Sequence, residues 1–147
     1  MGHCLGIGTG WSLKGMLTGK DTADPEFTGP KATAAYNQLF GTSAASVPVE
    51  AGGGSGTANV HWRDSTFANE LMTGYYSAGQ VNPISAVSVG SLADIGYAVN
   101  MGAAEPYTPP GHIRMVFSQD AVQLPNGLIL VGDVRAFRHR KRFKVSR

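Results

Sequence analysis

The sequence is poor in cysteine, in charge and in long apolar runs, and each shortage excludes a class of protein. Cys4 is the single cysteine among 147 residues, which excludes an internal disulfide and a zinc finger built from several sulfurs. Charged residues make up only 15%, too few for a coiled coil or a solvated disordered chain. No apolar run approaches the ~20 residues that span a bilayer. The length suits one domain with one hydrophobic core.

Glycine, by contrast, is abundant. The 20 glycines favour short elements joined by many turns over a bundle of long helices. The opening MGHCLGIG is compatible with the last turns of a helix, which the glycines at positions 6, 8 and 10 then stop. Residues 42–60 are small, polar and rich in glycine, and this composition predicts a flexible loop tip.

Two further segments carry helix signals. The first begins with Pro30, which suits the first helical position; either of the two residues before it can cap the helix, and Gly41 can end it. In the second, Ser85 can cap a helix that Gly96 ends, with apolar residues between them at helical spacing. We therefore expect short helices separated by long loops.

The character of the sequence changes after position 107. Residues 108–134 predict a linker and then a hairpin around a Pro-Asn-Gly turn. Residues 135–147 carry seven basic and no acidic side chains, whereas residues 1–134 carry five basic and ten acidic ones. Two alternatives stay open for this basic tail: a solvated end without a role, or a contact with an anionic surface. A short tail without a fold is no strong signal of nucleic-acid binding.

The four histidines are candidate metal ligands, and two of them have suitable surroundings. His139 lies among arginines, which would repel a cation, and His112 follows a Pro-Pro-Gly turn. His3 precedes a glycine-rich turn, and His61 is followed after eleven residues by Met72. Taken alone, each of these two patterns is weak.

Together the two patterns resemble a family. GHCLGIGTGW is similar to the second half of the HExxHxxG zinc helix of a metzincin, and HWRDSTFANELMTG is similar to the third-histidine and Met-turn region of leishmanolysin-like metallopeptidases. Further similar segments, in matching order and spacing, are FTGPKATAAYNQLFG, SVPVE, NPISAVSVGSLADIGYAVN and AAEPY. The resemblance is to bacterial members and covers residues 1–107, which would form the C-terminal part of the peptidase domain.

The resemblance implies a zinc site. His3 and His61 would be zinc ligands, Gly6 would reverse the chain after the zinc helix, and Met72 would form an apolar floor beneath the metal. Zinc-activated water would hydrolyse peptide bonds, so the implied substrates are proteins or peptides. The residues implied to line part of the substrate pocket are Thr73, Gly74, Tyr75 and Tyr76, and either tyrosine is a candidate donor to the oxyanion.

The sequence departs from the family pattern at its beginning. Aligned on HExxH, His3 is the second histidine, so the general-base glutamate would lie immediately before Met1 and the first histidine one residue earlier. Glu50 and Glu70 lie elsewhere in the motif order and cannot be assumed to replace that base. Because two histidines leave a catalytic zinc under-coordinated, we expect the 147-residue polypeptide to be inactive as a peptidase.

Two functions therefore follow from the sequence. The first is a leishmanolysin-like zinc metalloendopeptidase, of which this chain carries the C-terminal part in an α+β fold. The second is a non-catalytic remnant or binding module that keeps the fold and uses residues 135–147 to contact an anionic partner. Relatives of this branch are usually secreted or at the cell surface, whereas the opening residues show no charged and apolar leader.

Overall fold

The computed structural model describes residues 2–76 and 78–111, all of which belong to a compact unit spanning Met1–His112. The expected hairpin and the basic tail at 135–147 lie outside the described residues, so that part of the domain organisation stays a prediction. Short helices and a small antiparallel sheet form the described part, which confirms the expected α+β class. Among the described residues, no helix is long and apolar enough to cross a bilayer.

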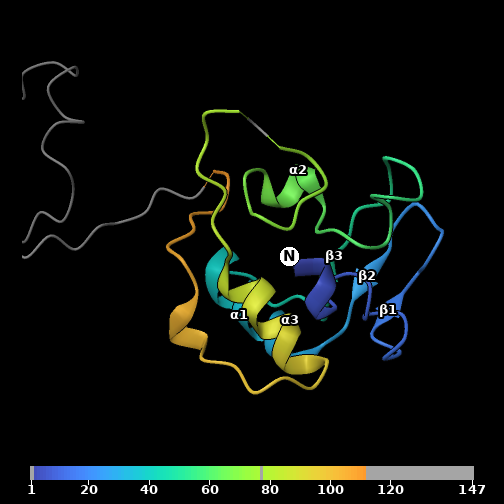
Figure 1. Cartoon of the computed structure of the whole chain (residues 1–147), viewed down its shortest axis with the longest axis horizontal. Helices are drawn as coiled ribbons and strands as arrows, with labels where there is room; N and C mark the ends of the chain where they lie inside the picture. The colour runs from blue at the N-terminus through green and yellow to red at the C-terminus, as the bar shows by residue number, and fades with distance from the viewer. Residues whose placement is uncertain (1, 77, 112–147) are drawn as a thin grey trace, which may run out of the picture. The chain divides into compact units, whose positions relative to one another are not determined.

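The elements are short and are joined by long loops (Figure 1). In chain order they are η1 (Gly2–Leu5), β1 (Leu17–Thr18), β2 (Glu26–Phe27), α1 (Pro30–Phe40), β3 (Val47–Pro48), α2 (Asp64–Phe67), α3 (Ala86–Asp94) and η2 (Met101–Ala103), where η denotes a 3-10 helix. Both helices predicted from capping signals are confirmed. The first runs from Pro30 to Phe40 and ends at Gly41 in the left-handed conformation (φ 61°), and Ser85 caps the second by accepting from the backbone N–H of Ser88.

The sheet extends toward the loops that carry the candidate site. Its order is β1-β2-β3, with Phe27 in β2 paired with Val47 in β3, and both side chains are fully buried. Beyond β3, Val49 forms an antiparallel bridge with Trp62, and Trp62 forms a parallel bridge with Thr73. These bridges place Trp62, the residue after His61, beside Thr73, the residue after Met72, although eleven positions separate the two.

An aromatic cluster forms the centre of the core beneath these bridges. The ring centroids of Trp11 and Trp62 lie 4.2 Å apart, and Phe67 stacks on Trp62 at 5.6 Å. All three side chains are fully buried. Burial of aromatic side chains on this scale dominates core stability, so the segment around His61 is anchored through its neighbour Trp62.

Helices α1 and α3 pack side by side (Figure 1), and α3 caps α1. Gly29 occupies the N-cap position of α1 but offers no side chain to the free N–H groups. The Asp94 carboxylate, at the end of α3, accepts from the backbone N–H groups of Lys31 (3.0 Å) and Ala32 (2.9 Å) instead. The cap therefore comes from a residue more than sixty positions away, and no local pattern indicates it.

Replacing Asp94 with alanine is expected to lower the free energy of unfolding by about 1–2 kcal/mol, because two N–H groups of α1 lose their acceptor. Urea denaturation measures the change. Asp24→Ala is the control: Asp24 is 70% exposed and pairs with Arg63, and an exposed pair contributes only about 0–1 kcal/mol. Equal losses in the two variants would contradict the capping role.

Candidate functional site

Two imidazole rings from distant parts of the chain face one another. Nε2 of His3 lies 2.9 Å from Nε2 of His61, although the two residues are 58 positions apart. The rings meet edge to face, with centroids 4.6 Å apart and an interplanar angle of 85°, and both are partly buried. The structure therefore brings together the two histidines whose sequence surroundings suit a metal site.

A backbone carbonyl fixes each ring from behind. Nδ1 of His3 donates to Ile7 O at 2.9 Å, and Nδ1 of His61 donates to Thr57 O at 3.0 Å. Because a carbonyl oxygen only accepts, both Nδ1 atoms carry the proton, and both Nε2 atoms of the neutral rings present lone pairs. Two facing lone pairs repel unless a cation, a proton or a metal ion, lies between them. Histidine ligands of metals are held in this way by carbonyls on the other nitrogen.

Burial lowers the pKa of His61 below its usual range. The neighbouring His3 acts in the same direction, whereas the hydrogen bond to Thr57 opposes the shift. Metal ions bind the neutral imidazole. The environment of His61 therefore favours the protonation state that a metal ligand requires.

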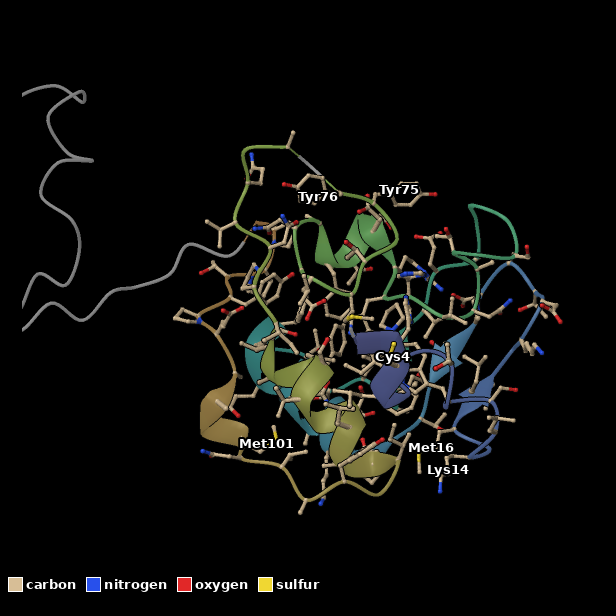
Figure 2. All side chains as sticks on the ribbon, in the orientation of Figure 1. Cys4, Lys14, Met16, Tyr75, Tyr76 and Met101 are labelled. Atoms are coloured by element: carbon tan, nitrogen blue, oxygen red, sulfur yellow. The ribbon has the colours of Figure 1, made fainter. Side chains whose placement is uncertain are left out.

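The histidine pair matches zinc in ligand type and comes close to it in spacing. Two nitrogens at ~2.0–2.1 Å from a tetrahedral zinc lie about 3.4 Å apart, roughly half an ångström more than the observed separation. Within residues 2–76 and 78–111, no group of three or more histidine, cysteine, aspartate or glutamate side chains is placed to hold a metal. Cys4, beside His3, is exposed (Figure 2). Among the described residues, His3 and His61 are therefore the two candidate ligands of such a site.

Met72 lies against the turn that carries His3. A Cβ atom at Gly2 would come within 2.5 Å of Met72 Sδ, and the methionine side chain is buried. The carbonyl of Met72 accepts from the backbone N–H of Trp62 at 3.0 Å, which ties it to the residue after His61. Met72 therefore contacts both histidine-bearing segments, and it is also part of the general core.

The turn after His3 comes very close to the backbone of Val60, the residue before His61. Gly6 has φ 99° and its N–H donates to His3 O, so the chain turns there. Two residues later, a Cβ atom at Gly8 would lie only 1.9 Å from Val60 O. Contact between this turn and the residue before His61 therefore requires glycine, whereas the sequence pattern predicts in Gly8 only a helix stop.

The loop predicted as a flexible tip instead carries a support for His61. Its end is held by hydrogen bonds from Asn59 N to Glu50 O and from the Asn59 side chain to Asp21. The Thr57 carbonyl orients the His61 ring. The Thr57 methyl group packs so close to Gly74 that a Cβ atom added at Gly74 would lie 2.2 Å from it. Thr57 had no sequence signal, because its partner is 17 positions away and glycine is common throughout this chain.

Neither nearby glutamate is free to act as a base. Glu50 accepts from the backbone N–H groups of Gly52 and Asp64, and these bonds hold its pKa below the usual range although burial acts to raise it. Glu70 is 1% exposed and accepts from Ser85, Ser88 and Met72; burial raises its pKa, and these donors oppose the shift. Both carboxylates are therefore held by hydrogen bonds that stabilise the local structure.

The residues expected to line a substrate pocket divide into two kinds. Thr73 is buried, and its hydroxyl donates to Glu70 O at 2.9 Å, so it stabilises the turn. Tyr75 and Tyr76 are 51% and 77% exposed and project near α2 (Figure 2). A Cβ at Gly53 would lie 3.1 Å from the Tyr75 hydroxyl, so this tyrosine leans over the loop that carries Thr57. The tyrosines are the exposed members of this segment.

Comparison with known proteins agrees with the resemblance. The model of the leishmanolysin family (peptidase M8) matches residues 9–110, more than half of the chain. The match includes His61, Glu70 and Met72 and begins after His3. No curated protein and no solved structure matches the chain. By the extent of the family match, the chain belongs to the leishmanolysin family of zinc metallopeptidases.

Proposed function

We propose that the chain carries the C-terminal part of a zinc metalloendopeptidase domain in which His3 and His61 bind the metal. The observation that supports this proposal most strongly is the 2.9 Å approach of the two Nε2 atoms, each on a ring whose Nδ1 is held by a carbonyl. Zinc, when bound, supplies a Lewis acid that polarises a peptide carbonyl and activates water for hydrolysis. Proteins or peptides are the substrates of this proposal.

The chain's own residues orient the two ligands. The carbonyls of Ile7 and Thr57 set the tautomers and the ring directions, which raises ligand basicity. Met72 supports the His3 turn from below. The exposed Tyr75 and Tyr76, directly after the Met72 turn, are positioned to meet a substrate, and Tyr75, which leans toward the loop before His61, is the better candidate to donate to the oxyanion.

A third ligand and a general base complete the proposed reaction. A catalytic zinc site uses three protein ligands, and loss of a general base alone costs a factor of ~10² to 10⁴ in rate. Because Glu50 and Glu70 are engaged elsewhere, we propose that the base is the glutamate that the HExxH pattern places directly before Met1. The 147-residue polypeptide by itself is then expected to bind zinc without cleaving peptides.

Zinc titration by calorimetry, combined with a casein assay on the same sample, tests the proposal. We expect one zinc ion per chain and no casein hydrolysis. A second polypeptide with His-Glu placed directly before Met1 completes the HExxH motif and is expected to bind zinc more tightly and to cleave casein. Failure of both polypeptides to bind zinc stoichiometrically would overturn the proposed metal site, and equal hydrolysis by both would overturn the proposed need for the added base.

A further inference from the structure

A buried carboxylate lies between the Met72 turn and the start of α3. Oε1 of Glu70 accepts from the backbone N–H of Ser85 (2.9 Å), the hydroxyl of Ser85 (2.8 Å) and the hydroxyl of Ser88 (2.6 Å). Oε2 accepts from the backbone N–H of Met72. Burying a carboxylate is costly unless donors surround it, and here two segments supply four donors.

One side of this network reaches the segment of His61. Ser88 Oγ, which donates to Glu70, accepts in turn from Trp62 Nε1 at 2.8 Å. Trp62 directly follows His61 and is fully buried in the aromatic cluster. The indole is therefore fixed in rotation by a hydrogen-bond chain that ends on the carboxylate.

The other side reaches the segment of His3. Glu70 Oε2 holds the backbone of Met72, and Met72 Sδ packs against Gly2, the residue before His3. The two sides also meet directly, since Trp62 N donates to Met72 O at 3.0 Å. One carboxylate thus fixes the supports of both imidazoles.

We infer that Glu70 is a positioning residue of the proposed zinc site, setting the separation of the His3 and His61 rings through Met72 and through Ser88 and Trp62. This inference rests on the proposed function, because it assigns the network to metal binding. Glu70 itself is not a metal ligand, since both of its oxygens are occupied by donors.

The chemistry of the donors explains why the residue must be an acid. Oε1 accepts from the backbone N–H of Ser85 and Oε2 from that of Met72, and a backbone N–H cannot become an acceptor. The side-chain amide of glutamine would aim its NH₂ group at one of these N–H groups in either orientation. Glu70→Gln therefore keeps the size of the side chain and breaks one side of the network.

Zinc affinity, measured by competition with a chelating dye, tests the inference on Glu70→Gln, Ser88→Ala and Asp94→Ala. Loss of a partner bonded directly to a metal ligand lowers metal affinity by about 10- to 100-fold. Because Glu70 acts one step further out, we expect the lower end of this range, about 10-fold, for Glu70→Gln. Ser88→Ala, which removes only the Trp62 side, is expected to lose less. Asp94→Ala at the other end of α3 is the control for lost stability, and its affinity should equal that of the unmodified chain.

A metal-free readout separates positioning from zinc binding itself. In the unmodified chain we expect a nuclear Overhauser effect between the ring protons of His3 and His61, and we expect it to weaken or vanish in Glu70→Gln. If the unmodified chain binds no zinc, the proposed function fails. The nuclear Overhauser effect between His3 and His61 then decides alone whether Glu70 sets the separation of the two rings.

Three results would overturn the inference while leaving the proposed function intact. The first is unchanged zinc affinity and an unchanged ring contact in folded Glu70→Gln. The second is a loss of zinc affinity in Asp94→Ala as large as that in Glu70→Gln when the two variants are equally stable. Such a result would show a general structural effect. If Glu70→Gln does not fold, Ser88→Ala decides: lower affinity in the folded variant supports the inference, and unchanged affinity refutes it.

Discussion

Replacing His61 with alanine is expected to abolish stoichiometric zinc binding and to leave the fold intact. The variant keeps His3, but a single imidazole is too few ligands for a stable zinc site. The expected structural cost is small, because the ring makes one hydrogen bond to Thr57 O, typically worth about 1 kcal/mol, and its removal relieves the facing lone pairs. Calorimetric zinc titration measures binding, and urea denaturation measures stability.

His112→Ala is the control for this variant. His112 lies outside the described residues and has no place in the proposed site, so we expect its removal to leave zinc binding unchanged. Retained binding in His61→Ala, or loss of binding in His112→Ala, would contradict the assignment of the ligands. Equal weakening in both variants would instead indicate nonspecific binding by histidine side chains.

Among glycine-to-alanine substitutions near the site, Gly8→Ala is expected to cause the largest loss of stability. At Gly8 the backbone has φ 77°, and the new Cβ would lie 1.9 Å from Val60 O, an atom of the backbone. A left-handed alanine costs roughly 1–2 kcal/mol and forced overpacking about 1–3 kcal/mol more. We expect unfolding by urea to show a combined loss of about 2–5 kcal/mol, and zinc binding to weaken because the turn after His3 moves away from His61.

Gly15→Ala provides a matched control, since it has a similar φ of 67° and no atom within 4 Å of the added Cβ. It carries the conformational cost alone, about 1–2 kcal/mol, and should bind zinc like the unmodified chain. The difference between the two variants therefore isolates the approach between Gly8 and Val60. Equal stability and equal zinc affinity in both would show that this contact does not position the site.

The two main helices could be predicted because their signals are local. Pro30 and Gly41 bracket one helix, and Ser85 caps the other through its own side chain. The glycine content predicts short elements joined by turns, whereas the α+β class was expected through the family resemblance. These features depend on neighbours in sequence, which a reader of the chain can see.

Neither the cap of α1 nor the supports of the site could be predicted, because their partners are distant in sequence. Asp94 caps a helix that starts 64 positions earlier, and Glu70 collects donors from a loop and from α3. The approach of His3 to His61 was expected only through the family resemblance. No periodicity or spacing rule relates such pairs, since tertiary packing alone brings them together.

The alternative function based on the basic tail stays a prediction. Residues 135–147 lie outside the described residues, so the structure adds nothing to the charge pattern that motivates it. The histidine pair, in contrast, is a geometric finding of the described part. It supports the proposed metal site, which a non-catalytic remnant of the same fold would also retain.

A crystal structure of the zinc-loaded chain, with data collected on both sides of the zinc absorption edge, tests the central claim most directly. The account predicts one strong anomalous peak between Nε2 of His3 and Nε2 of His61, at about 2.0–2.1 Å from each nitrogen. A zinc peak bound elsewhere on the chain, or the two rings found apart with no metal between them, would contradict it.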